Sequence, residues 1–138
     1  MKKTTIDDVI FSNNKSIIDS VGILTAIESG KDVPFDINRM FYVYDVGDEC
    51  VRGKHAHYKT QQLLICLNGK IDVVCKDGTR EVRYLLESPQ QSVFIPEMIW
   101  DEQIYRSRDS VLLSICNTHY ERDDYINDFK TFQDLKSK

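Results

Sequence analysis

Two of the three histidines have the spacing needed for proton chemistry. His55 and His57 lie two residues apart, so on a β-strand both side chains point to the same face. Imidazole is the side chain that ordinarily titrates near neutral pH, and two of them on one face can divide the work of a general acid and a general base. The alternative is a pair of solvated histidines on a loop after Gly53. We expect the isolated His119 on the surface or at a subunit contact.

The residues around this pair resemble a metal-binding motif but lack two of its ligands. His55-x-His57 is followed by Gln62 and Gly69, which resembles the first cupin motif of His-x-His, a carboxylate and a later glycine. The second cupin motif places its last histidine five residues after a proline, where this chain has Pro96 and then Asp101. A metal cupin uses roughly three histidines and one glutamate. His55, His57 and Asp101 could still form a facial triad, but we expect no metal ion.

The elements that must carry these residues are predicted to be strands. From residue 41 to residue 117, short apolar or alternating runs are separated by turn residues, a pattern typical of all-β domains. Asn68-Gly69 is the strongest hairpin signal, and Lys76-Asp77-Gly78 and Glu87-Ser88-Pro89 indicate two more turns. The predicted strands are 22–28, 39–45, 62–67, 70–75, 80–86, 92–95, 101–105 and 111–117.

Only the C-terminal tail is predicted to be helical. From Asp124, the apolar residues Tyr125, Ile126, Phe129, Phe132 and Leu135 recur at steps of mainly three and four residues, which places most of them on one helical stripe. We expect one domain over residues 1–138, with a helical tail at about 124–136.

Composition narrows the class of function. With 138 residues, 41% hydrophobic and 29% charged, the chain has the composition of a globular domain. Its net charge of −4 argues against nucleic-acid binding, and its apolar runs are too short for a membrane span. No secretory signal is visible at the N-terminus. Three of the four cysteines lie in apolar segments, so we expect reduced thiols in a cytoplasmic protein.

Several longer segments make the resemblance more specific. From about Ile17 to Phe132 the chain resembles the sugar 3,4-ketoisomerases, metal-independent cupins that act on dTDP-4-keto-6-deoxyglucose. The segments that carry the resemblance are 22–28, 33–44, 52–57, 62–69 and 120–126.

This resemblance implies a cupin jelly roll, or double-stranded β-helix barrel, that binds a dTDP-linked 4-keto-6-deoxyhexose. It implies a homodimer with exchanged N-terminal strands. The reaction would move the ketone from carbon 4 to carbon 3, in the biosynthesis of deoxyaminosugars for lipopolysaccharide, other surface glycans or glycosylated natural products.

The residues suit that chemistry. The reaction removes the proton on carbon 3, passes through an enediolate and returns a proton at carbon 4, which requires a base and a donor to the enediolate oxygens. No cofactor is needed, because no hydride leaves the substrate. We predict His55, His57 and the phenol of Tyr42 as catalytic groups. The predicted substrate-binding residues are Arg39 and Arg52, as partners of the diphosphate, with Tyr44, Gln62, Trp100 and Asp101.

The chain departs from the family pattern at two places. The family usually has Trp-His-Glu where this chain has Trp100-Asp101-Glu102, and Asp-Arg-Gly where it has Asp19-Ser20-Val21-Gly22. We expect Asp101 to face the barrel interior beside His55 or His57, where its carboxylate would raise the pKa of that histidine. The alternative is a solvated loop aspartate.

Other functions remain open at this point. A dTDP-deoxysugar epimerase would use the same proton abstraction but return the proton to the original carbon. A non-catalytic nucleotide-sugar-binding cupin is the alternative from another class, and a metal-dependent dioxygenase or isomerase is a fourth. The sequence does not determine the carbon-4 configuration of the product, the final sugar, or which histidine is the base.

Overall fold

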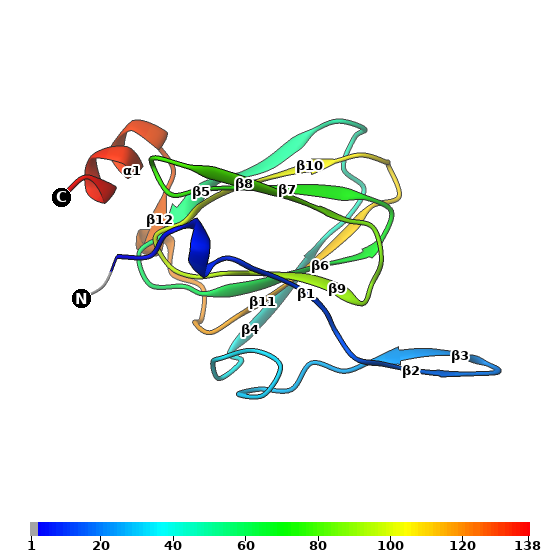
Figure 1. The fold of residues 1–138 in the computed structure, drawn as a ribbon. Coiled ribbons are helices and arrows are strands. Elements are labelled where there is room, and N and C mark those ends of the chain that lie inside the picture. The colour runs from blue at the N-terminus through cyan, green and yellow to red at the C-terminus, as the bar shows by residue number, and fades with distance from the viewer. Residues whose placement is uncertain (1–2) are drawn as a thin grey trace.

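The computed structural model describes residues 3–138 and shows two antiparallel sheets that face each other (Figure 1). One sheet has the strand order β1-β9-β6-β11-β4 and the other β12-β5-β10-β7-β8, while β2 and β3 form an arm that projects from this body. The prediction of an all-β jelly roll with a short C-terminal helix is confirmed. The elements are β1 (Ile10–Asn13), β2 (Ser16–Asp19), β3 (Gly22–Thr25), β4 (Arg39–Val43), β5 (Val51–His57), β6 (Gln62–Asn68), β7 (Ile71–Lys76), β8 (Glu81–Leu86), β9 (Gln91–Ile95), β10 (Trp100–Tyr105), β11 (Val111–Cys116), β12 (Tyr125–Ile126) and α1 (Phe129–Lys136), with 3-10 turns at Ile6–Asp8 and Arg122–Asp124.

The strands with clear apolar patterns match the prediction. β4 and β6 to β11 begin and end within two residues of their predicted ranges, whereas β3 ends at Thr25 instead of residue 28. The short strands β1, β2 and β12 were not predicted, because two to four residues carry too little periodicity to be recognised. β5 was also absent from the predicted strands, because most of its residues are not apolar.

The turn at Asn68-Gly69 does not form the predicted hairpin. β6 lies between β9 and β11 in one sheet, and β7 lies between β10 and β8 in the other. Both edges of β6 are therefore already paired, and the turn carries the chain from one sheet to the other. By contrast, Lys76-Asp77-Gly78 does join a paired hairpin, β7 and β8.

The core fills the space between the two sheets. Inward side chains such as Leu64, Val73, Val93 and Leu112 are almost completely buried there. A second apolar cluster lies on the outer face of the first sheet, where Val33 and Phe35 of the loop after β3 pack against Ile65 and its neighbours. The alternation along each strand thus separates an inner face from an outer face, and it decides which side chains can reach a site inside the barrel.

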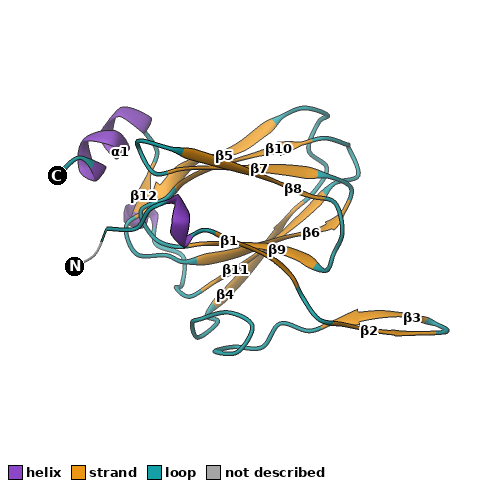
Figure 2. Cartoon of the chain, viewed as in Figure 1, coloured by secondary structure: helices purple, strands orange, loops and turns teal. Residues whose placement is uncertain are grey.

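The C-terminal tail differs from the prediction. The C-terminal helix α1 (Figure 2) begins at Phe129, five residues after Asp124. Asp128 caps it, because its side chain accepts a hydrogen bond from the backbone N–H of Thr131 at 2.9 Å. Residues Tyr125–Ile126 are instead strand β12, paired with β5. This pairing places residues from the C-terminal region beside the two histidines.

Two further findings concern the chain as a whole. None of the helices in the described part of the chain is long and apolar enough to cross a membrane. All four cysteines are free; Cys66, Cys75 and Cys116 are buried and Cys50 is exposed.

Candidate active site

His55 and His57 lie at the end of β5 and face the space between the sheets. Their ring centroids are 5.1 Å apart in an edge-on arrangement, and His57 is buried while His55 is half-buried. Because both residues belong to a paired strand, the alternative of two loop histidines is wrong. The intermediate burial of His55 leaves part of its side chain accessible to solvent.

His57 is held in its neutral form. Burial lowers the pKa of His57, and the nearby His55 and Arg39 lower it further. The carboxylate of Asp124 raises the pKa but does not compensate, so His57 has a pKa of about 4. The carboxylate that acts on His57 is Asp124; Asp101, which was expected beside one of the two histidines, is the direct partner of His55. At neutral pH His57 has a free ring nitrogen that can accept a proton.

Tyr125 completes the pair as a third aromatic group. Its ring centroid lies 4.5 Å from that of His57 and 5.1 Å from that of His55, edge-on to both. Tyr125 is the direct partner of His57 in the register of β12 and β5. The apolar spacing of the C-terminal tail had predicted a helix at Tyr125. The segment 120–126, which carries part of the family resemblance, was the signal in the sequence that could have linked this residue to the site.

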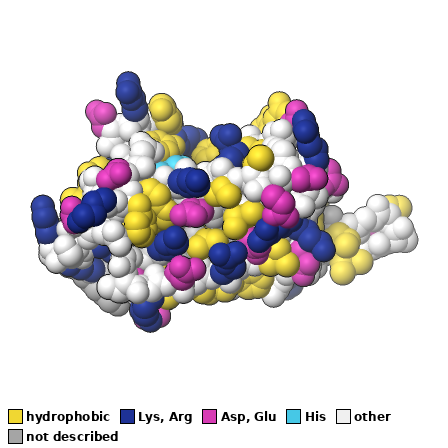
Figure 3. All heavy atoms as spheres, turned by 90° about the horizontal axis from the view of Figure 1, so that it is seen from above, with side chains coloured by type: hydrophobic (Ala, Val, Ile, Leu, Met, Phe, Trp, Pro, Cys, Tyr) yellow, Lys and Arg dark blue, Asp and Glu magenta, His cyan; other side chains and the backbone are white. Residues whose placement is uncertain are grey.

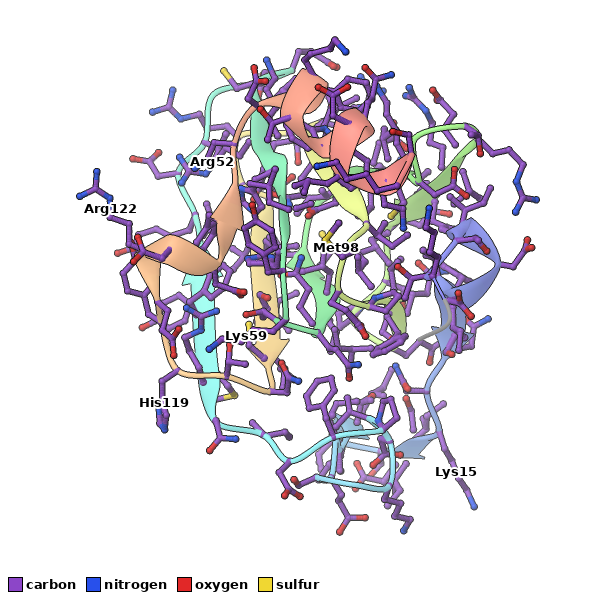
Figure 4. All side chains as sticks on the ribbon, turned by 90° about the vertical axis from the view of Figure 1, so that its left-hand side faces the viewer. Lys15, Arg52, Lys59, Met98, His119 and Arg122 are labelled. Carbon is purple, nitrogen blue, oxygen red and sulfur yellow. The ribbon has the colours of Figure 1, made fainter. Side chains whose placement is uncertain are left out.

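Arg52 reaches the face of the histidines through a β-bulge. Arg52 lies three positions before His55, a spacing that in a regular strand would put the two side chains on opposite faces. The register shifts between Asp101 and Glu102, so that His55 pairs with Asp101 and Arg52 pairs with the inward Gln103. Gly53 and Lys54 form the bulge with φ of 82° and 59°. Arg52 thus lies on the same face of the sheet as Gln103, and its side chain is exposed at the rim of the molecule (Figure 4).

Arg39 faces the interior from the first sheet. It is the direct partner of the buried Cys116, and its guanidinium lies over the rings of Phe41, at 5.8 Å, and Tyr120, at 5.7 Å. The Nε atom of Arg39 is buried and makes no hydrogen bond within residues 3–138. A buried donor without a partner is costly, so this nitrogen is available to an anionic ligand.

Asp101 lies behind the histidines in a buried polar network. It is the direct partner of His55 and is 0% exposed, so it faces the interior as predicted and is not a loop residue. Its carboxylate accepts hydrogen bonds from Gln62 Nε2, at 3.3 Å, and from Gln103 Nε2. Gln62 Oε1 accepts a hydrogen bond from Ser114 Oγ at 3.1 Å. Burial raises the pKa of Asp101, although His55 and the two amides oppose the increase.

Tyr42 and Tyr44 do not join the histidines. Tyr42 is the direct partner of Leu113 on the outer face of the first sheet, and its ring stacks on that of Tyr44 at 6.0 Å. The two phenols line a surface depression of about 580 Å³ together with Cys50 and Arg52. The strand alternation that turns Arg39 and Phe41 inward therefore turns Tyr42 away from the reacting centre.

Trp100 is also separated from the site, which corrects its prediction as a substrate-binding residue. It is buried on the outer face of the second sheet, where its ring packs against Phe129 and Phe132 of α1. Its indole N–H donates to Glu102 Oε2 at 2.9 Å. Trp100 anchors the C-terminal helix, and its neighbour Asp101 points to the opposite face.

No three His, Cys, Asp or Glu side chains gather as a set of metal ligands within residues 3–138. His119 is exposed and points away from the barrel (Figure 4).

Comparison with known proteins identifies close relatives. The chain is 38% identical over 126 residues to the TDP-4-oxo-6-deoxy-alpha-D-glucose-3,4-oxoisomerase of Aneurinibacillus thermoaerophilus, and the aligned region covers 91% of each chain. It is similar to the sugar 3,4-ketoisomerase QdtA of Thermoanaerobacterium thermosaccharolyticum in complex with TDP, with a TM-score of 0.90 and 34% identity over 94% of this chain and 95% of that chain. A QdtA mutant with asparagine in place of a histidine holds TDP-4-keto-6-deoxyglucose, with a TM-score of 0.90, 33% identity and 94% of each chain covered.

The epimerases are more distant. The dTDP-4-dehydrorhamnose 3,5-epimerase of Bacillus anthracis matches with a TM-score of 0.78 at 15% identity, over 89% of this chain and 79% of that chain, a likeness that shows the fold alone.

The model of the FdtA family, described as WxcM-like, C-terminal, matches residues 7–137. The solved structures that match at more than 30% identity include sugar 3,4-ketoisomerases. The chain is a member of the FdtA family, described as WxcM-like, C-terminal.

Proposed function

We propose that this protein is a nucleotide-sugar 3,4-ketoisomerase that moves the ketone of TDP-4-keto-6-deoxyglucose from carbon 4 to carbon 3. The observation that carries the proposal is the pair of inward imidazoles, 5.1 Å apart, with His57 neutral at physiological pH. The relatives support it, since the similar oxoisomerase and the QdtA structures are named for this activity and this sugar.

The histidines would move the proton between the two carbons. We propose that neutral His57 accepts the proton from carbon 3 and that His55, the more exposed ring, helps to return a proton at carbon 4. Each such transfer contributes about 10²–10⁴-fold to a rate. Because the electrons stay within the sugar, the reaction requires no redox cofactor.

Two arginines would bind the diphosphate. The buried Nε of Arg39 lacks a partner, and Arg52 lies at the rim on the face of His55. A guanidinium binds phosphate oxygens with paired hydrogen bonds. Tyr42 and Tyr44 line the depression next to Arg52, so we place them beside the nucleotide and not at the reacting carbons. Gln62 and Asp101 would support His55 from behind.

We further propose a homodimer with exchanged N-terminal strands. The arm of β2 and β3 projects from the body (Figure 1) and carries apolar side chains exposed to solvent (Figure 3), including Ile18 at 71% and Leu24 at 58%. An apolar groove of about 300 Å³ lies between the arm and the outer face of the first sheet, lined by Ile23, Leu67 and Leu113. Such a surface on one chain is typical of an interface.

The place of the reaction follows from its chemistry. A 3-keto sugar is the substrate that an aminotransferase needs to make a 3-amino-3,6-dideoxy sugar, which supports a role in the synthesis of surface glycans. Buried free thiols at Cys66, Cys75 and Cys116 suit a reducing compartment, and we propose the cytoplasm.

One experiment separates this function from its alternatives. The protein is incubated with TDP-4-keto-6-deoxyglucose in deuterium oxide, with and without EDTA, and the sugar is followed by NMR. Migration of the ketone with solvent deuterium at carbon 4, unaffected by EDTA, is the expected result. Inversion or exchange without migration would show an epimerase, and no reaction would show a binding protein. Activity that EDTA abolishes and a divalent metal restores would contradict the metal-independent mechanism.

A further inference from the structure

Tyr125 lies against both site histidines but has no role in the proton transfers assigned to them. Its phenol ring packs edge-on against both imidazoles, with centroids 4.5 Å from His57 and 5.1 Å from His55. Strand β12, which carries it, contains only Tyr125 and Ile126. Two residues cannot hold a strand in register by backbone pairing alone, so other contacts must place this ring.

A buried carboxylate supplies those contacts. Asp124, 4% exposed, accepts hydrogen bonds from the backbone N–H groups of Lys59, at 2.9 Å, and Thr60, at 3.2 Å, and from the Thr60 hydroxyl. Its own carbonyl accepts from the backbone N–H of Tyr58 at 2.9 Å. These bonds tie the start of β12 to the turn that follows His57, immediately beside the histidine pair.

We propose that Tyr125 is a third catalytic residue, which carries the hydroxyl proton between the two sugar oxygens, and that Asp124 is its positioning residue. This inference rests on the proposed ketoisomerase function. It replaces Tyr42, which lies on the outer face of β4, as the phenol of the site.

The proton balance of the reaction supplies the role. When the base takes the proton from carbon 3, the electron pair of that C–H bond forms the double bond between carbons 3 and 4, and the π pair of the carbonyl moves to the carbon-4 oxygen, which gains charge. Tyr125 donates its phenolic proton to that oxygen. The phenolate then takes the proton from the carbon-3 hydroxyl, the carbon-3 ketone forms and carbon 4 receives a proton. The tyrosine ends as it began, and no outside reactant is required.

The surroundings of Tyr125 suit a donor. Burial raises the pKa of its phenol, although the charge of Arg39 opposes the increase. The hydroxyl therefore keeps its proton at neutral pH until an oxyanion forms within reach. The histidines, occupied with the carbon-bound proton, are not needed for this second transfer.

The first test replaces Tyr125 by phenylalanine, which keeps the ring and removes the hydroxyl. We expect kcat to fall by about 10²–10⁴-fold with KM little changed and the thermal midpoint retained. In deuterium oxide, ketone migration should fall more than exchange at carbon 3, because His57 still removes that proton. The control is Tyr84→Phe, at a ring that stacks on Phe11 away from the site, and we expect full activity.

The second test is a double-mutant cycle with Asp124→Asn. If Asp124 acts through Tyr125, the double variant loses no more activity than Tyr125→Phe alone, whereas an effect of Asp124 through His57 or a general structural defect would multiply the two losses. Asp123→Asn, on the exposed side of the same turn, is the matched control. Should Asp124→Asn fail to fold, Thr60→Ala removes a single donor to the carboxylate and replaces it in the cycle.

These experiments distinguish a failure of the Tyr125 proposal from a failure of the proposed function. A wild-type protein that does not isomerise the sugar refutes the function itself. A wild-type protein that isomerises it while Tyr125→Phe keeps the wild-type kcat and the wild-type ratio of exchange to migration refutes the role of Tyr125. Multiplicative losses in the cycle refute the positioning role of Asp124 alone.

Discussion

Asp101 and His55 are direct partners across β10 and β5, so a fully buried carboxylate lies beside a half-buried imidazole. The side chains of Gln62 and Gln103 both donate hydrogen bonds to this carboxylate. Gln62 belongs to β6 of the first sheet, so its hydrogen bond to Asp101 links the two sheets behind His55.

Replacing either site histidine should remove most of the activity. His55→Asn and His57→Asn are each expected to lower kcat/KM by about 10²–10⁴-fold, since each removes a proton carrier. His119→Asn, at an exposed histidine outside the barrel, is the control and should retain activity. Steady-state assays with the TDP-sugar measure the effect, and wild-type turnover in both site variants would refute the assignment.

The pH dependence of stability should differ between the wild type and Asp101→Asn. Because the folded state raises the pKa of Asp101, the wild type is most stable below the ordinary aspartate pKa and loses stability as the pH rises toward the folded value. Asparagine does not titrate, so the variant should gain stability relative to the wild type between pH 4 and pH 7. Urea unfolding at both values measures this, and a constant difference would contradict it.

Asp77 should show the opposite behaviour. Burial raises its pKa, but hydrogen bonds from the backbone N–H groups of Arg80, Ile6 and Thr79 outweigh burial and bring it to about 2. The stabilisation is present above the unfolded pKa and is lost as the pH falls through the folded value. Asp77→Asn should therefore cost about 2 kcal/mol at neutral pH and much less near pH 2. The exposed Asp36→Asn should cost little at either pH.

Gly53 should be intolerant of a side chain. Its φ is +82°, and an added Cβ would lie 2.8 Å from Gln103 Nε2 and 3.1 Å from the Asp101 carbonyl oxygen. Gly30 has a similar φ of +72° with nothing within 4 Å of an added Cβ. Gly30→Ala should cost about 1 kcal/mol from backbone strain, and Gly53→Ala should cost more and also impair activity, because the bulge positions Arg52. Equal unfolding free energies for the two variants would show that only strain matters.

Charges on the arm should separate the proposed dimer. Ile18→Asp combined with Leu24→Asp places one carboxylate on each face of the exposed arm, which a free arm would tolerate and a buried interface would not. Light scattering should give twice the mass of one chain for the wild type and the mass of one chain for the variant. Leu85→Asp, at an exposed apolar residue of β8, is the control and should remain dimeric. A monomeric wild type would end the proposal.

Much of the site could be read from local spacing. The separation of His55 and His57 by two residues puts both on one face of any strand, and the alternation along β6 to β11 predicts those strands within two residues. These features depend on neighbours in sequence, for which strand geometry gives a direct rule. The all-β class followed from the same kind of reasoning, whereas the inward position of Asp101 was expected from the family resemblance, because Asp101 stands where the family has a histidine.

Other features depended on contacts between distant segments. The bulge at Gly53 and Lys54 turned Arg52 inward, and the pairing of β12 with β5 brought Tyr125 to the histidines. The outward faces of β4 and β10 removed Tyr42 and Trp100 from the site. A strand's periodicity shows which side chains share a face, but not which face meets the core. Sheet order and register decide that, and they are set by hydrogen bonds and packing between residues far apart in the chain.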